Sequence, residues 1–451
     1  MFTNKDLKKL IVPLIIEQLL GISVGMFDTI MISSLGDSAI SGVSLVDMLN
    51  VLMINIFAAL ATGGAVICAH EIGRMKAERE RTGEVSNDYP EARFHAVQLL
   101  WVLLFASILI AGLAIFFRVG LLGLCFGKIE DDVMGYALTY FVISAISYPA
   151  IAIYNGLAAL FRTMGNSNVT MVASLILNVL NVVGNAILIY GFNMGVAGAA
   201  WSSTFSRLFG MVMLLVLIRR KSGAIYVRFS EFCLPKPKPI RRILKIGIPG
   251  SLENSVFQLG RILVISMIAG FGTVQVAANA VANNLDSFGV IPGQALGLAT
   301  ITVVGQAIGA GNFEEARKYE QKLLKISFIS MAILNILILT TLPLTLKLYK
   351  ISPEALKLAS TLIILHDGFA IIFWPPSFVL PNALRAAQDV KFTMFISIFS
   401  MIVFRIFFTW VIGVKLGFGI IGVWIAMIFD WIFRGLSFIT RIRTGKWLSN
   451  L

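Results

Sequence analysis

Long apolar runs recur along the whole of this 451-residue chain, and they constrain its fold more than any other feature. Each has about 20 residues or more, enough for an α-helix to cross a hydrocarbon core about 30 Å thick. Twelve runs lie near residues 10–34, 44–72, 95–118, 133–161, 168–190, 195–218, 244–270, 277–304, 324–346, 355–384, 392–414 and 419–440. They are continuous, whereas the strands of a membrane barrel alternate apolar and polar residues. The sequence therefore predicts an all-α integral membrane protein with twelve transmembrane helices.

The basic residues predict how these helices are oriented. The net charge is +13, but Lys and Arg lie in short connections between the runs, so we expect no nucleic-acid partner. If the N-terminus is cytoplasmic, 27 of the 37 Lys and Arg fall in inner segments and only six in outer connections. The excess of positive charge on inner loops then predicts a multi-pass protein of the plasma membrane with both termini in the cytoplasm.

A basic connector with several prolines follows the sixth run and divides the chain. It predicts an N-lobe at 1–218 with helices 1–6, a cytoplasmic linker at 219–243, and a C-lobe at 244–451 with helices 7–12 and a short cytoplasmic tail. Lys and Arg are frequent in the linker, as in other inner loops.

The two lobes are related by an internal repeat. A shift of 236 residues places Pro13 on Pro249, Glu17 on Glu253 and Gly36 on Gly272, and a shift of 223 places 162–171 on 385–394. Six helices per lobe mean that both copies start on the same side of the membrane. The repeat is therefore parallel, with a pseudo-two-fold axis along the membrane normal.

Several motifs resemble those of the multidrug and toxic compound extrusion (MATE) family. They are "IPGQALGLATITVVGQAIGAG" at 291–311, "FDTIMISSLG" at 27–36, "LFRTMGNSNVTM" at 160–171 and "LRAAQDVKFTM" at 384–394. The resemblance covers nearly the whole chain. It implies a secondary-active exporter of amphipathic organic cations, driven by antiport with protons or sodium ions through alternating access of two lobes. It also implies a monomer that uses no cofactor apart from the coupling ion.

The resemblance further implies where the coupling ion binds. Asp28 stands where the family has a first-helix carboxylate, and Glu253 where many members have a seventh-helix glutamate, so sodium is a candidate ligand at either. One branch of the family has an aspartate on the fifth helix, where this chain has Asn185, which favours the other branch. That branch has a tenth-helix aspartate, but the candidate here, Asp367, lies about two turns earlier.

The membrane-embedded polar residues also indicate function on physical grounds. A charged carboxylate at the bilayer centre costs about 2.5–3.5 kcal/mol on insertion scales, so Asp28 should face the bundle interior or water. It is a candidate cation site, or alternatively a polar contact with another helix. Glu17 lies eleven residues earlier on the same face of the helix. It lines an inner entry path or pairs with a Lys or Arg near the inner interface.

Amides supply further candidates for a polar path. Asn178, Asn181 and Asn185 are spaced by three and four residues, which places them on one face of the fifth span. They coordinate an ion beside Asp28 or form hydrogen bonds between helices, as Asn does in membranes. Asn283 is the repeat partner of Asp47 and is a candidate cavity-lining residue.

Other charged residues of the spans point to structural roles. Asp430 and Arg434 are four residues apart, the spacing of an ion pair within one helix. Arg261 has no partner that the sequence reveals. The three histidines, among them His366, are too scattered to predict a metal site.

Two alternative functions remain open at this stage. Neither Gly-Lys pair is followed by Ser or Thr, so no phosphate-binding loop for ATP is predicted, and no hydrolase or redox motif occurs. We therefore expect no enzyme activity, although a membrane-embedded enzyme without a motif is one alternative. The other is a lipid-linked oligosaccharide flippase of the same superfamily. Such flippases usually carry several cavity arginines, and few occur in the spans here.

Overall fold

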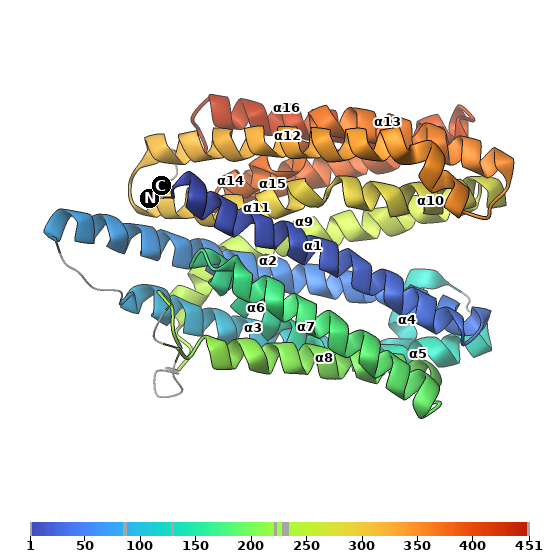
Figure 1. Ribbon diagram of the computed structural model, residues 1–451, viewed down its shortest axis with the longest axis horizontal. Helices are drawn as coiled ribbons and strands as arrows, with labels where there is room; N and C mark the ends of the chain where they lie inside the picture. The colour runs from blue at the N-terminus through green and yellow to red at the C-terminus, as the bar shows by residue number, and fades with distance from the viewer. Residues whose placement is uncertain (1, 84–87, 128–129, 221–222, 228–233, 449–451) are drawn as a thin grey trace. The chain divides into compact units, whose positions relative to one another are not determined.

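The computed structural model describes residues 2–83, 88–127, 130–220, 223–227 and 234–448, and α-helices dominate them. Within these ranges, eleven helices are long and apolar enough to cross a membrane, or twelve when a bent pair is taken as one span. This confirms the predicted all-helical membrane fold. The chain divides into two compact units, Phe2–Ser251 (the N-unit) and Leu252–Leu451 (the C-unit), shown in Figure 1. In the predicted linker, residues 221–222 and 228–233 lie outside the described part.

The N-unit is a helical bundle. Its helices are α1 (Asn4–Ser33), α2 (Asp37–Thr82), α3 (Pro90–Phe116), α4 (Arg118–Phe126), α5 (Asp131–Ile146), α6 (Tyr148–Thr163), α7 (Ser167–Asn185) with its π-helical continuation η1 (Ala186–Gly191), and α8 (Gly195–Leu217). Helix α1 packs against α7, and α2 packs against α3, α5 and α6. The predicted fourth span is bent by 48° between α5 and α6. A proline in the first turn of α6 accounts for the break, because proline cannot continue a preceding helix.

The C-unit repeats this plan. Its helices are α9 (Pro237–Ala269, whose first turns belong to the N-unit), α10 (Thr273–Gly289), α11 (Ile291–Gly309), α12 (Phe313–Thr345) with η3 (Leu346–Leu348), α13 (Pro353–Phe378), α14 (Leu380–Ala386), α15 (Val390–Ser400) with η4 (Met401–Phe407) and η5 (Thr409–Lys415), and α16 (Gly419–Arg443). The run that predicts one span at 277–304 is divided between α10 and α11, and Pro292 stands in the first turn of α11.

Equivalent turns of the two units share unusual backbone conformations. Gly36 (φ +99°) and its repeat partner Gly272 (φ +98°) precede α2 and α10, in a region that side chains rarely adopt. Gly165 (φ +79°) and its partner Gln388 (φ +61°) form matching turns. The agreement between distant turns supports the repeat that the sequence predicts.

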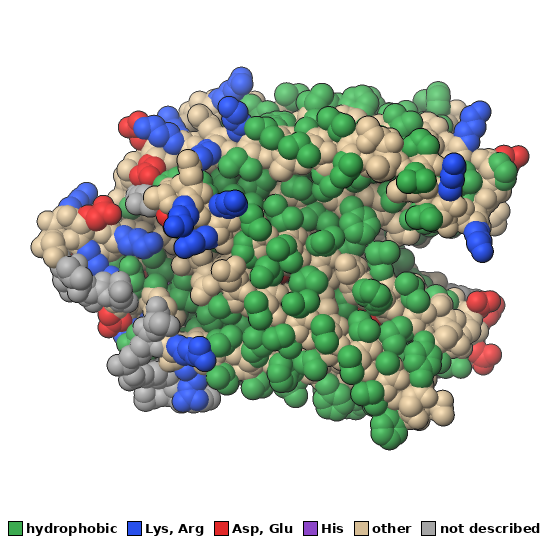
Figure 2. Space-filling model, viewed as in Figure 1, with side chains coloured by type: hydrophobic (Ala, Val, Ile, Leu, Met, Phe, Trp, Pro, Cys, Tyr) green, Lys and Arg blue, Asp and Glu red, His purple; other side chains and the backbone are tan. Residues whose placement is uncertain are grey.

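Charge is distributed as expected for membrane-spanning helices. Figure 2 shows apolar side chains along the sides of the helices in each unit, with large residues such as Ile30 and Leu109 each 63% exposed. In this view Lys and Arg lie mainly near the ends of the helices, and few lie along their sides. Exposure of so much apolar surface to water would be unfavourable, whereas contact with the hydrocarbon of a bilayer is not.

Candidate functional site

The N-unit places Asp28 beside the amides of α7. Asn185 is fully buried, and its Nδ2 donates a hydrogen bond to Asp28 Oδ1 over 2.5 Å. Asp28 itself is half-buried near the end of α1. The sequence-predicted carboxylate and amide thus lie together, although they are 157 residues apart.

The other two asparagines of α7 make hydrogen bonds between helices. Asn178 Nδ2 donates to the Leu20 carbonyl (2.7 Å), and Asn181 Nδ2 donates to Ser203 Oγ (3.0 Å). The Oδ1 atoms of Asn181 and Asn185 are buried and accept no hydrogen bond from any described residue. Buried acceptors without a donor are costly, so these two oxygens are positioned to accept a cation or a proton donor.

Glu17 pairs with Arg162, which is one of the two outcomes that the sequence leaves open. The Arg162 guanidinium lies 2.9 Å from Glu17 Oε1, and Thr170 donates to Glu17 Oε2 over 2.6 Å. The pair ties α1 to the end of α6 and the start of α7. Both side chains are largely buried, at 16% and 11% exposed.

Glu253 makes the same contact in the C-unit. Its Oε1 accepts from Arg385 over 2.8 Å, and Arg385 is the repeat partner of Arg162. Arg434 approaches the same oxygen at 3.9 Å. Asp430 Oδ1 instead accepts a 2.5 Å hydrogen bond from Ser400. The structure therefore gives Asp430 and Arg434 other partners than the predicted ion pair within α16.

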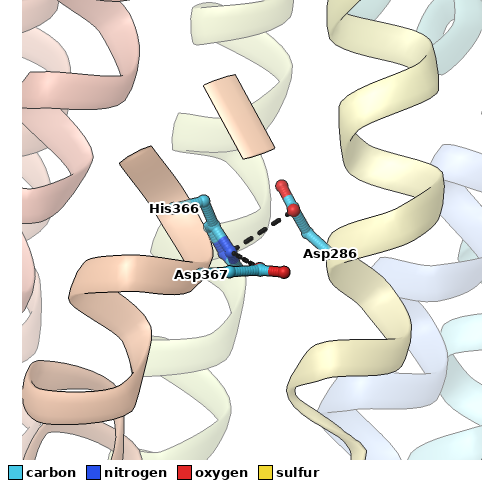
Figure 3. Close-up of side chains that lie close together, drawn as sticks. All are labelled: Asp286, His366 and Asp367. Carbon is cyan, nitrogen blue, oxygen red and sulfur yellow. Dashed lines mark hydrogen bonds and ion pairs between the residues drawn. The ribbon is translucent and has the colours of Figure 1, made fainter. Parts of the chain in front are cut away.

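A cluster of two aspartates and one histidine lies inside the C-unit and is drawn in Figure 3. Asp286 comes from α10, whereas His366 and Asp367 are neighbours on α13. His366 Nδ1 lies 2.8 Å from Asp367 Oδ1 and 3.4 Å from Asp286 Oδ1. One ligand atom from each residue lies within 4.8 Å of the others, an arrangement suited to a bound cation.

The surroundings of this cluster supply little compensation for its charge. Asp286, His366 and Asp367 are 5%, 5% and 0% exposed. Among the described residues no Lys or Arg forms an ion pair with either carboxylate. Both oxygens of Asp286, Oδ2 of Asp367 and Oδ1 of the buried Asn335 also lack hydrogen-bond partners there. Carboxylate and amide oxygens are the ligands preferred by hard cations, and a neutral imidazole adds a nitrogen ligand.

The sequence alone did not predict that His366 lies beside two carboxylates, and the cluster includes neither of the other two histidines. Sequence reasoning missed it because its partner Asp286 is 80 residues away on another helix. The available signal was the His-Asp pair inside an apolar run, since ionisable residues within spans are functional candidates by default. The arginine partners of Glu17 and Glu253 were missed for the same reason, although both lie in the repeated motif at 162–171 and 385–394.

Asn283 lies apart from this cluster. It is exposed on α10, and its Nδ2 donates to the Asn279 carbonyl over 2.8 Å. It lines a cavity of about 230 Å³ within the C-unit, together with Arg261, Arg405 and Trp424. That this is the substrate cavity stays a prediction.

Comparison with known proteins gives consistent relatives over the full length. The family model described as MatE matches residues 13–187 and 249–411. The chain is 28% identical to "Uncharacterized transporter YisQ" of Bacillus subtilis, with 97% of this chain and 93% of the relative covered. It is 24% identical to "Probable multidrug resistance protein NorM" of Thermotoga maritima, covering 98% and 93%.

A solved structure shows the same fold. It is described as the outward-facing conformation of a multidrug resistance MATE family transporter of the MOP superfamily. The TM-score is 0.87 at 21% identity, and 98% of this chain and 96% of that chain are covered. At this identity the likeness concerns the arrangement of helices alone.

Proposed function

The chain belongs to the MatE family of membrane transporters, which are not enzymes, and we propose that it is a secondary-active exporter of amphipathic organic cations. In this proposal two lobes, residues 1–218 and 244–451 joined by the linker 219–243, alternate in their access to the two sides of the plasma membrane. Antiport with protons or sodium ions drives export, and both termini lie in the cytoplasm. The names of several relatives as probable multidrug resistance proteins support the proposal.

The observation that carries this function is the Asp28 site. A carboxylate inside the membrane accepts a hydrogen bond from Asn185, while the amide oxygens of Asn181 and Asn185 have no donor among the described residues. A sodium ion would bind such oxygens, and a proton on Asp28 would supply a donor. Either event neutralises the carboxylate and weakens its attraction for an organic cation. By linkage, binding of the organic cation must weaken ion binding by the same factor.

We propose the cluster of Asp286, His366 and Asp367 as a second cation site, in the C-unit. Two buried carboxylates without an arginine or lysine partner are expensive unless a cation or a proton compensates them. Glu253, by contrast, already has Arg385 at 2.8 Å. The coupling role that the family resemblance implies for Glu253 stays a prediction, and its ion pair favours a structural role.

Export from reconstituted vesicles tests the proposal. A fluorescent organic cation is loaded, and either a proton gradient or a sodium gradient is imposed across the membrane. A membrane potential adds about 2.3 kcal/mol per elementary charge per 100 mV to the driving force. We expect export by the wild type to follow one gradient and to be lost in a folded Asp28→Asn variant. Export by that variant against a concentration gradient would contradict the role of Asp28.

The same assay separates the flippase alternative. A flippase moves a lipid-linked precursor, so transport would require such a lipid and would ignore both ion gradients. Wild-type export of the organic cation that depends on one gradient excludes this alternative as the main activity.

A further inference from the structure

The cavity within the C-unit differs in charge from the rest of the proposed cation pathway. It has a volume of about 230 Å³ and is bounded by α9, α10, η4 and α16. Its polar lining consists of Arg261, Arg405, Asn279 and Asn283, and Trp424 contributes to the apolar wall. No acidic residue is among the side chains that line it.

Neither of the two arginines forms an ion pair among the described residues, although the buried Asp430 is close enough to Arg405 to attract its charge. Within the described residues, neither Arg261 nor Arg405 forms an ion pair or a side-chain hydrogen bond, and Arg405 Nε is buried without a partner. Two other arginines of the C-unit differ, since Arg385 binds Glu253 and Arg441 binds Asp389. Arg434 lies 3.9 Å from Glu253 Oε1, although its Nε and Nη1 have no hydrogen-bond partner among the described residues. The two cavity arginines differ from these three in that neither forms an ion pair within the described part of the chain.

Both arginines also lie at a depth where an unpaired charge is costly. Arg261 is eight residues before the end of α9 at Ala269, about 12 Å along the helix. Arg405 is ten residues before Lys415, the end of its span. Charged residues at such depth occur where they pair with one another or face a water-filled cavity or a transport pathway. An anion in the cavity would supply the missing partner through charge-assisted hydrogen bonds.

The internal repeat shows that equivalent positions of the two units differ in charge. At the shift of 236 residues, Asp28 corresponds to Val264, Asp47 to Asn283, and Gly25 to Arg261. Val264, Asn283 and Arg261 all line the cavity. At these positions the C-unit therefore has no acid and one cation, so this cavity suits an anion, whereas the separate cluster of Asp286, His366 and Asp367 suits a cation.

The rest of the lining indicates what kind of anion fits. Trp424 Nε1 donates to Asn279 Oδ1 over 3.2 Å, which orients the amide and leaves its N–H groups free to donate to a ligand. Val264, Met427 and the Trp424 ring form an apolar wall beside the guanidinium groups. An apolar wall with few convergent polar groups is typical of small-molecule sites, and here those groups are donors.

We propose that this cavity binds the carboxylate or phosphate group of an amphipathic organic molecule, so that the C-unit recognises anionic or zwitterionic compounds. The inference rests on the proposed export function for its meaning in transport, and it extends the substrate class beyond cations. Binding itself is independent of any ion gradient and can be measured alone.

The test measures binding of radiolabelled 2-naphthoate by equilibrium dialysis. Full-length protein is placed in nanodiscs of phosphatidylcholine, a lipid without net charge. The neutral 2-naphthylmethanol and the cationic 2-naphthylmethylammonium serve as matched ligands. We expect the affinity for naphthoate to be at least about tenfold higher than the affinity for the alcohol, which is the gain expected of a charge-assisted hydrogen bond. Equal affinity for naphthoate and the alcohol would overturn the proposal without the use of any variant.

Variants then assign binding to the cavity. Arg261→Gln and Arg405→Gln should each weaken naphthoate binding about tenfold or more, and Arg405→Lys should retain part of it. The control is Lys415→Gln, which removes a cation of the same span that lies over Trp410 outside the cavity lining. Naphthoate binding that survives both glutamine substitutions in folded protein would contradict the site.

A second arm distinguishes a lipid ligand from a soluble one. Nanodiscs that contain phosphatidylglycerol should compete with naphthoate if an acidic lipid headgroup occupies the cavity, and wild type should then retain more of this lipid than Arg405→Gln. If the ligand is soluble, naphthoate affinity will be the same in both lipids. Protein that binds naphthoate but exports no cation would contradict the proposed function alone, whereas cation export without naphthoate binding would contradict this inference alone.

Discussion

Removal of the Glu253 carboxylate separates a structural role from a coupling role at this position. Glu253 is 5% exposed and holds Arg385 at 2.8 Å, with Arg434 at 3.9 Å from the same oxygen. In Glu253→Gln both guanidinium groups lose this acid, and truncation of one partner of a buried ion pair costs about 3–5 kcal/mol. We therefore expect a large loss of unfolding free energy.

The repeat-equivalent pair gives a matched comparison. Glu17 has one arginine partner, Arg162, and a hydrogen bond from Thr170 that a glutamine can still accept. Arg162 and Arg385 are similarly exposed, at 16% and 18%, but Glu253 also faces Arg434, which is 4% exposed and poorly screened by water. Glu17→Gln should therefore cost about 1–3 kcal/mol, less than Glu253→Gln.

Reversible unfolding in mixed detergent micelles, followed by circular dichroism, measures both losses. A double-mutant cycle with Arg385→Gln should give a coupling energy of about 0.5–3 kcal/mol, because the two residues share one contact. The double variant should regain part of the stability lost in Glu253→Gln, since it no longer buries an unpaired arginine.

A structural role of Glu253 is incompatible with one outcome of these measurements. Surface substitutions usually change the free energy of unfolding by no more than about 0.5 kcal/mol. If Glu253→Gln changes it by no more than this and also loses ion-driven export, the reasoning from the ion pair is refuted. Glu253 would then be a coupling residue, as the family resemblance implies.

Three further predictions concern other parts of the molecule. Asp28→Asn should abolish ion-driven export while its thermal unfolding temperature changes little, because the half-buried carboxylate forms no ion pair among the described residues; unchanged transport would refute its role. Asp367→Asn should weaken binding of the coupling ion to the C-unit about tenfold or more, measured by calorimetry with sodium at fixed pH and with protons in sodium-free buffer, whereas Lys415→Gln should not. Gly272→Ala should cost about 1–3 kcal/mol of unfolding free energy, since its φ of +98° is nearly restricted to glycine. Gly270→Ala, two residues earlier in an ordinary conformation, is its control, and equal losses would contradict the conformational argument.

The helical architecture of this protein is largely determined by local sequence. A continuous apolar run of about 20 residues forms a helix in lipid, because a helix satisfies the backbone hydrogen bonds of the run within the run itself. The repeat between Glu17 and Glu253 and the paired glycines at 36 and 272 are likewise visible from the sequence. The breaks in the helices are harder to predict: two helices, α10 and α11, replace one predicted span, and Pro292 stands in the first turn of α11.

The partners of the polar side chains were decided by tertiary structure. A contact of Asp28 with Asn185 is one of two arrangements that the sequence leaves open for this amide. His366 meets Asp286, and Arg385 meets Glu253, only because the helices pack in a particular rotation. Hydrophobicity places a residue at a depth in the membrane, whereas contact between helices depends on the direction of each side chain around its helix axis. For that reason the sequence identified which charges lie in the membrane, and only the packed structure showed which of them are neutralised and which, like Arg405, are left without a partner among the described residues.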